Sequence, residues 1–480
     1  MSTPVANTRS KPDPLLVDIA RYVSRKNVGG PAARKLARYC LMDALGCALQ
    51  ALTTPDCIKL LGPVVPGIVV PNGARVPGTQ FQLDPVTAAF NISCLIRWLD
   101  FSDTWWTGGH PSDNLGGILA TADYLSRTRL ARGHKPLAMR DVFTAMIKAY
   151  EIQGVLSEGN SFDRPEIGLD SVLLVKFASA AVVTQMLGGS VDEIVNAVSN
   201  AVIDGHPLNI YRKMPNAGPR KSWAAADASS RAVWLSLTTM RGEMGYANAF
   251  TAKTWGFQDV LYKGRPLEVP RSFGSYVMEN IQFKISYPAQ RHAQTAAECA
   301  VRLHPLVRHR LDEIEKIEMH THDLALHMIS VTGPLPNFAA RDHCLQYIVA
   351  VGLLDGDITN ASYEDVHAAN PQIDALRSKM VVSEDRRYTR DYQSLAKRSN
   401  LNSVQVFFKD GSKTPKVEIE YPIGDPVRRN EGLPLLEKKF RNNLAYRLPA
   451  RRNARVAALL GDQRALEAMP VNEFMDLMAI

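Results

Sequence analysis

The spacing of apolar residues changes twice along this chain of 480 residues, and these changes constrain the fold more than any other feature. Before residue 275 apolar side chains recur at helical spacing, in Leu15–Val28, Ala32–Leu52, Ala138–Glu158 and Val191–Ile203. Beyond it, Ile314–His322 alternates like a strand, and Ser403–Tyr421 reads as a hairpin with Asp410-Gly411 at its turn. Helical spacing returns from Leu433. The pattern predicts a mostly α protein: a large helical domain from residues 1–272 and 428–480, with a smaller α+β domain inserted at 273–427.

One turn-rich segment, Asp100–Gly117, concentrates carboxylates, a threonine, a histidine and two tryptophans between apolar runs. The flanking runs Thr87–Leu99 and Ile118–Leu130 are predicted to be buried helices, and Gly108, Gly109 and Pro111 prevent one continuous helix. Polar side chains on a loop held between core helices are typical of active sites. The alternative is structural: Asp103 caps a turn and His110 occupies a satisfied surface position.

A second segment, Asn216–Arg231, places a Gly-Pro turn and two cations before a helix rich in alanine and serine. The free N–H groups at the start of that helix, with Arg220 and Lys221 beside them, favour a carboxylate or phosphate site. The segment lacks P-loop spacing. The alternative is a solvated basic pair.

Charge and cysteine content narrow the classes of partner and cofactor. The net charge of +8 suits an anionic small molecule or nucleic acid, but the basic residues form no stripe with interleaved aromatics, so we expect no nucleic-acid partner. The densest basic stretch, Lys438–Arg455, is expected to be a solvated helix face. The six cysteines contain no C-x-x-C pair, which indicates neither a zinc nor a recognisable iron–sulfur motif and suggests free thiols in a reducing compartment.

The location expected from sequence is the cytoplasm. The apolar run Leu60–Val70 is broken by Pro63 and Pro66, so no membrane span is expected. The segment Met1–Pro14 lacks the apolar region of a secretory signal. Its Asp13 and three prolines make it a poor mitochondrial presequence, although a mitochondrial location stays open.

These segments resemble the MmgE/PrpD family, and the resemblance runs nearly from end to end. Besides the two segments above, it rests on Val70–Asp84, Gly242–Gly245, Trp255–Val260, Gly274–Asn280 and Met469–Leu477. It implies a helical domain with an α+β lid domain, a cleft between them and a homodimer. It further implies a lyase that needs no metal or other cofactor and removes water from a small tricarboxylate, 2-methylcitrate or a related 2-alkylcitrate, to give the 2-alkyl-cis-aconitate. Two alternatives stay open: a cis-aconitate-type decarboxylase of the same fold, and a dehydratase of secondary metabolism that takes a longer alkyl chain.

The resemblance also implies a set of site residues. Asp100, Thr104 and His110 come from the first loop, Lys221 from the helix start, and His292 from the lid. Lys221 is expected to anchor a carboxylate, Thr104 to position by hydrogen bonding, and Asp100 to orient a histidine. His110 and His292 are the acid–base candidates, because histidine transfers protons near neutral pH, but the sequence does not tell which takes which role.

Three arginines are further candidates for binding the substrate's carboxylates, namely Arg212, Arg220 and Arg291. Arg212 and Arg291 could equally be ordinary ion-pairing residues. His320, His322 and His327 lack neighbouring ligands at a diagnostic spacing, so we expect no metal there. His343 matches a family motif and is expected to serve structure at the domain junction.

One residue departs from the family pattern. At Ser171 the family has an active-site histidine, and serine offers a hydrogen bond but no base at neutral pH. The loop from Trp105 to His110 is also shorter than is typical. We therefore count Ser171 among the substrate-binding residues and predict space for a longer 2-alkyl chain. The alternatives are a neutral exchange and a weakly active paralogue.

Overall fold

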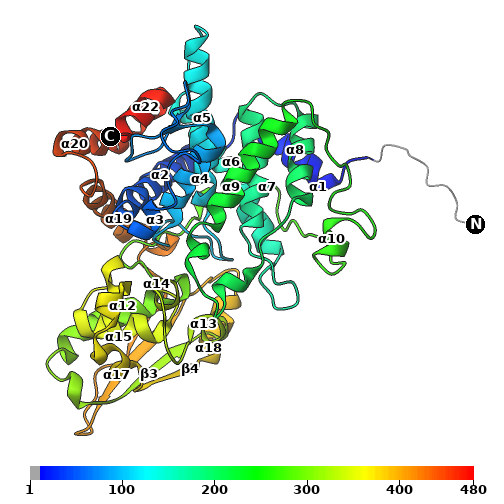
Figure 1. The fold of residues 1–480 in the computed structure, drawn as a ribbon. Helices are drawn as coiled ribbons and strands as arrows, with labels where there is room; N and C mark the ends of the chain where they lie inside the picture. The colour runs from blue at the N-terminus through cyan, green and yellow to red at the C-terminus, as the bar shows by residue number, and fades with distance from the viewer. Residues whose placement is uncertain (1–10) are drawn as a thin grey trace, which may run out of the picture.

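A computed structural model describes residues 11–480 and divides them between two apolar cores. Core membership changes between Ile285 and Tyr287 and again between Ile419 and Ile423. We call residues 11–285 and 423–480 the helical part, and residues 287–419 the α+β part; they lie in the upper and lower halves of Figure 1. The prediction of a cytoplasmic location rests largely on the Met1–Ser10 stretch, which lies outside the described residues.

Long helices build the helical part, and several of them begin with a proline or a capping residue. Proline suits this position because its missing N–H would have no helical partner there, and Pro14, Pro31 and Pro85 each occupy it. The elements before residue 285 are α1 (Pro14–Val23), α2 (Pro31–Ala51), α3 (Pro55–Ile58), β1 (Ala74–Arg75), β2 (Gln82–Leu83), α4 (Pro85–Arg97), α5 (Leu115–Ala131), α6 (Met139–Gly159), α7 (Leu173–Met186), α8 (Val191–Ile203), α9 (Ala224–Thr239), α10 (Phe257–Val260) and α11 (Tyr276–Glu279). The predicted helices are confirmed, except that α1 ends five residues before Val28.

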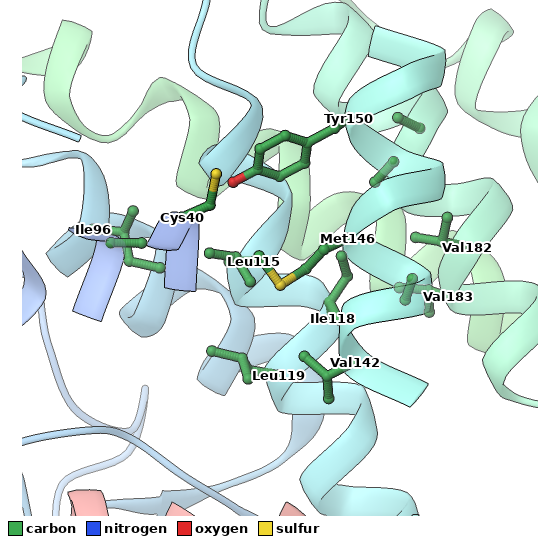
Figure 2. Packing of buried hydrophobic residues seen from close by; sticks show 14 of the residues in the cluster. Cys40, Ile96, Leu115, Ile118, Leu119, Val142, Met146, Tyr150, Val182 and Val183 are labelled. Atoms are coloured by element: carbon green, nitrogen blue, oxygen red, sulfur yellow. The ribbon is translucent and has the colours of Figure 1, made fainter. Parts of the chain in front are cut away.

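Helices α2, α4, α5, α6 and α7 meet in the larger core, part of which Figure 2 shows. Helix α5 lies so close to α4 that a Cβ on Gly116 would come within 2.5 Å of the Ala89 carbonyl oxygen. In Figure 2 Tyr150 of α6 and Cys40 of α2 point toward one another. The Tyr150 hydroxyl then donates to Asp103 Oδ2 (2.6 Å), so the core reaches directly to the loop after α4.

The C-terminal helices return to this same core. Helix α19 (Arg429–Leu444) packs on α2, where Phe440 closely approaches Gly46. It is followed by α20 (Ala450–Gly461), α21 (Gln463–Ala468) and α22 (Val471–Met478). In Figure 1 these orange and red helices stand beside the blue α2. Both ends of the described chain therefore pack in the core of the helical part.

The α+β part is a four-stranded sheet in the order β4-β3-β5-β6 with helices packed against it. The strands are β3 (Ile314–Thr321), β4 (Met380–Glu384), β5 (Asn402–Phe408) and β6 (Val417–Ile419). The helices are α12 (Gln294–Val307), α13 (Asp323–Ile329), α14 (Phe338–Arg341), α15 (Leu345–Asp355), α16 (Asp365–Ala368), α17 (Pro371–Arg377) and α18 (Arg386–Gln393). The predicted strand is confirmed as β3 and the predicted hairpin as β5–β6. The parallel pairing of β4 with β3 was not predicted.

Across residues 11–480 none of the helices combines the length and the apolar character needed to cross a membrane.

Candidate active site

The loop between α4 and α5 is folded by its own polar groups. Asp103 accepts hydrogen bonds from the Ser112 N–H (3.1 Å) and the Tyr150 hydroxyl (2.6 Å), which tie the loop to α6. The Thr104 hydroxyl and the Trp105 N–H both donate to the Gly109 carbonyl (3.1 Å each). This tight turn needs positive φ at Gly108 and Gly109 (104° and 82°), a region that glycine enters without strain. The turn brings His110 back to Asp100.

Asp100 and His110 form a buried pair at the centre of the site. His110 Nε2 lies 3.0 Å from Asp100 Oδ1, and Lys284 Nζ lies 3.1 Å from Asp100 Oδ2. Arg97 also contacts Asp100, and Lys284 donates to the Asp100 carbonyl (2.8 Å). Burial would raise the pKa of Asp100, but Arg97, Lys284 and His110 hold it well below its ordinary value. Asp100 is therefore an anion that accepts from three cationic or N–H donors.

Its partner, His110, is a neutral imidazole. Burial, with the charge of Arg97, lowers the pKa of His110 to about 3. Since Nε2 faces a carboxylate, the single ring proton of the neutral form lies on Nε2. Nδ1 then carries a lone pair, and it is buried without a hydrogen-bond partner among residues 11–480. An oriented, unoccupied lone pair of this kind is what a general base requires.

A second ion pair joins the two parts of the molecule. Lys221, in a short 3-10 turn (Pro219–Ser222) before α9, donates to both carboxylate oxygens of Asp342 (2.6 and 2.5 Å). Its third contact is His343 Nδ1 at 3.0 Å. Burial lowers the pKa of Lys221, with Asp342 opposing that shift; the charge of Lys221 in turn holds the pKa of Asp342 below its ordinary value. We conclude that the bidentate pair is ionised and links α9 to the residues that follow α14.

Within residues 11–480, one group could hold a metal: Asp100, Asp342 and His343 each place a potential ligand atom within 4.8 Å of the others. Both carboxylates, however, already accept hydrogen bonds from lysines, Lys284 on Asp100 and Lys221 on Asp342. Two ammonium groups at these oxygens repel a further cation. The donor set therefore fits anion binding better than metal binding.

His292 lies on the α+β side, in the 3-10 turn Arg291–Ala293 before α12. Its ring contacts Arg291 (3.3 Å to Nε2) and His322 (Nδ1 to Nε2, 3.2 Å). Burial lowers the pKa of His292 far below its ordinary value, and the nearby cations Arg291 and Lys284 lower it further.

Comparison with known proteins finds relatives that match this chain along almost its whole length. A model of the MmgE/PrpD N-terminal domain matches residues 17–270, and a model of the MmgE/PrpD C-terminal domain matches residues 287–462. The chain belongs to the MmgE/PrpD family. It is 57% identical over 483 residues to a 2-methylcitrate dehydratase of Cupriavidus necator, covering 100% of this chain and 99% of that relative. The corresponding enzyme of Salmonella typhimurium is 54% identical over 485 residues, with both chains covered at 100%. A mitochondrial 2-methylcitrate dehydratase of Yarrowia lipolytica is 46% identical over 477 residues, covering 98% of this chain and 91% of the relative.

Within this family member the structure brings most of the predicted residues to one region. Asp100, Thr104 and His110 share the α4–α5 loop, and the charges of Lys221 and Asp100 interact. Half-buried Ser171 lies near the turn, with its hydroxyl 4.0 Å from where a Cβ on Gly109 would stand.

The three arginines differ in their surroundings. Arg212 is paired with Asp170 and interacts electrostatically with Asp100. Arg291 donates to the Tyr392 hydroxyl (2.8 Å) beside His292. Arg220 instead stacks over Trp223 (4.2 Å to the ring centre) and meets Asp227 at 3.3 Å, with 40% of its side chain exposed. Of the three, Arg220 is directed away from the site.

Sequence reasoning missed Lys284, Arg97 and Asp342. Lys284 stands alone between the apolar residues Phe283 and Ile285, and a single cation in such a segment is a usable signal because lysine is rarely buried without a function or a partner. Asp342 could have been noticed beside His343, which contacts Lys221 in addition to lying where the two parts meet.

The expectation that Lys438–Arg455 is a solvated face is wrong for Lys439. This side chain is 8% exposed and donates to Asp43 (2.7 Å) and to the carbonyls of Phe101 (2.6 Å) and Lys284 (2.7 Å). The buried Asp43 supplies the countercharge that lets Lys439 enter the core. Lys439 thereby fixes the backbone on both sides of the Asp100–Lys284 contact.

Proposed function

We propose that this protein is a cofactor-independent hydro-lyase that converts 2-methylcitrate to 2-methyl-cis-aconitate and water. The observation that carries the proposal is its similarity, along the full chain, to proteins named 2-methylcitrate dehydratase. The buried cations around the Asp100–His110 pair support it, because a substrate with three carboxylates needs such cations to enter a buried site.

Dehydration first requires a base for the C–H beside a carboxylate. We assign this role to His110 Nδ1, with Asp100 on Nε2 stabilising the imidazolium that forms. The low pKa of His110 applies to the protein without substrate and reflects burial of the ring among cations. A bound trianion reverses the sign of that field and raises the basicity of His110.

The electron pair left by the proton forms the new double bond as the C–O bond to the tertiary hydroxyl breaks. The departing oxygen needs a proton to leave as water. We assign that proton to the Lys284 ammonium, whose pKa burial lowers to about 8, so that it releases a proton readily near neutral pH. After product release His110 loses its proton to solvent and Lys284 regains one, so that protons balance over the cycle.

Lys221 can bind a substrate carboxylate only after its hydrogen bonds to Asp342 are broken. The Asp342 and His343 contacts occupy three donor directions of the Lys221 ammonium. We propose that the α+β part acts as a lid: when it separates, Asp342 leaves Lys221, and a substrate carboxylate takes the same position. In the bound state His292 and Arg291 contact the substrate from the lid, and Thr104 and Arg212 contact it from the helical part.

We propose the two-domain layout expected from sequence, supported by the two separate cores, but we draw the lid domain at residues 287–419 in place of 273–427, because Phe273, Met278 and Ile285 pack in the helical core. We also propose a homodimer, since Leu208 (63% exposed), Ile210 (58%) and Trp234 (46%) leave apolar surface on the helical part. Light scattering on the eluting protein checks this, and a monomeric mass contradicts it. The proposed location is the cytoplasm, with the mitochondrion as the alternative that the name of the Yarrowia relative suggests.

The alkyl chain of the substrate is a separate question, on which Ser171 bears. The Ser171 hydroxyl lies 4.0 Å from where a Cβ on Gly109 would stand, and serine is a much smaller side chain than the histidine that the family resemblance leads us to expect here. We propose that the site accepts chains longer than methyl, and that Ser171→His reduces turnover of the longer chain more than that of 2-methylcitrate.

The test is to incubate purified protein, with a chelator present, with citrate, 2-methylcitrate, a 2-hexylcitrate analogue and cis-aconitate, and to follow products by mass. Loss of water from 2-methylcitrate supports the proposal. Preference for the longer chain redirects it to a dehydratase of secondary metabolism. Loss of carbon dioxide from cis-aconitate without water loss from any citrate overturns it in favour of a decarboxylase.

A further inference from the structure

His322, the last polar group before α13, is buried against the acid–base candidate His292. It is fully buried, and its ring stacks on Tyr392 at 4.0 Å with an interplanar angle of 5°. Its Nε2 lies 3.2 Å from His292 Nδ1. Each imidazole nitrogen in this contact either carries a proton or accepts one, so the neighbours of His322 determine which.

Two neighbours fix the proton of His322 on Nε2. The backbone N–H of Ala325 donates to Nδ1 (3.3 Å), so Nδ1 presents a lone pair. On the other side, Nε2 lies 3.4 Å from Asn400 Oδ1. The orientation of that amide is set independently, because Asn400 Nδ2 donates to the Arg291 carbonyl (2.9 Å) and the oxygen must therefore face His322.

It follows that His322 Nε2–H points at His292 Nδ1, which must accept. Arg291 Nη2 is almost equally far from both ring nitrogens of His292 (3.4 Å to Nδ1 and 3.3 Å to Nε2), so it lies over the ring face and along neither lone pair. A neutral His292 consequently carries its own proton on Nε2. A second proton on His292 Nδ1 would set two N–H groups against one another at 3.2 Å. The charged groups near this ring, Arg291 on the same turn and Lys284 on the helical part, disfavour a cation further.

We propose that His322 is a positioning residue that holds His292 as a neutral Nε2–H donor. The inference rests on the proposed dehydratase for its catalytic meaning: His292 donates a hydrogen bond to a substrate oxygen and neither removes nor delivers the proton. The base is then His110, and the open question of which histidine takes which role is answered by their partners.

The first test reads the tautomers directly and needs no activity. In protein labelled with ¹⁵N-histidine, long-range ¹H–¹⁵N spectra at pH 7 should show Nε2–H tautomers for both His292 and His322. Signals are assigned from the spectra of His292→Gln and His322→Gln. A His292 with its proton on Nδ1, or an imidazolium, overturns the proposal even if the enzyme is fully active.

The second test uses an isosteric pair. Glutamine at 322 can place an N–H donor near the original Nε2, whereas glutamate places an acceptor there. We expect His322→Gln to retain most of kcat for 2-methylcitrate, and His322→Glu to lose about 100-fold, the usual effect of misaligning one donor in an active site. In His322→Glu the His292 signal should also change to Nδ1–H or imidazolium.

His320→Gln is the matched control, since His320 lies on the same strand but bonds to Ser383 (3.0 Å) away from the site. Equal kcat for folded His322→Gln and His322→Glu overturns the proposal. If wild-type protein dehydrates none of the citrates, the proposed function fails, while the spectra still decide the tautomer.

Discussion

Two buried histidines, one in each part of the molecule, differ chiefly in their partners. His110 of the helical part meets a carboxylate, and its other nitrogen is left with a lone pair. His292 of the α+β part meets the imidazole of His322, and we infer that its other nitrogen carries the proton. Burial lowers the pKa of both rings, so pKa alone does not separate them. The partner determines whether a buried histidine can act as a base or as a donor.

The largest effect is expected when the partner of the proposed base is removed. Asp100→Asn keeps the shape of the side chain but loses the anion that fixes the His110 tautomer and stabilises its protonated form. We expect kcat for 2-methylcitrate to fall about 10³-fold, within the range of general base catalysis. Steady-state kinetics measure it, with the exposed Asp374→Asn as the control. A loss below tenfold would contradict the assignment of His110.

Removing the anchor should affect binding more than chemistry. In Lys221→Met, Asp342 loses its partner and the substrate loses a cation. We expect kcat/KM to fall about 100-fold, mostly through KM, as for loss of a charge-assisted contact. Exposed Lys213→Met should change neither constant. An unchanged KM in Lys221→Met would show that the carboxylate binds elsewhere.

A smaller effect is expected at a cation–π contact between the two parts. Arg398, from the α+β part, lies over the rings of Trp106 (4.6 Å) and Tyr276 (5.5 Å) of the helical part. Loss of this cation–π contact, about 1 kcal/mol or more, should weaken lid closure. We predict that Arg398→Ala raises KM about tenfold with kcat nearly constant, and that Arg398→Lys recovers part of the loss. A change in kcat alone would place Arg398 outside lid closure.

The low pKa of His322 gives a prediction on stability. Burial lowers it to about 3, so the unfolded chain binds a proton between pH 6.5 and 3 that the folded protein does not. The contribution of His322 is therefore complete above pH 6.5 and declines as pH falls, by up to about 1.4 kcal/mol per pH unit.

Carboxylates such as Asp113, whose pKa burial raises to about 7, act in the opposite sense. The measure is therefore the difference in urea unfolding between His322→Gln and wild type. That difference should shift in favour of the variant from pH 6.5 to pH 4. A difference that stays constant with pH contradicts a neutral, buried His322.

The smallest effect is expected at Arg220. Its guanidinium is turned to the surface over Trp223, although it is the immediate neighbour of Lys221. We expect Arg220→Ala to change kcat/KM less than twofold. A tenfold loss would mean that Arg220 turns into the site when substrate binds.

The fold was predictable where pattern is local. Alternation predicted β3, and the Asp-Gly turn predicted the β5–β6 hairpin. Strand β4 was missed because its five residues show no clean alternation and it pairs in parallel with a strand some sixty positions earlier. Nothing in the local sequence signals that pairing.

The site divides in the same way. Asp100 and His110 meet through one loop, and Gly108, Gly109 and Pro111 predict that loop from the sequence. Lys284 reaches Asp100 through a tertiary contact within the helical part, and Asp342 reaches Lys221 through a contact between the two parts. Lys439 resembled its solvated neighbours because the buried countercharge, Asp43, lies almost four hundred residues earlier.

The most direct test of the account compares wild-type protein and His110→Asn on 2-methylcitrate, with a chelator present and products followed by mass. We predict that wild type releases water to form 2-methyl-cis-aconitate, and that the folded variant does so at least about 10³-fold more slowly. Equal rates, or no loss of water by wild type, would contradict the assignment of His110 as the base of a dehydratase.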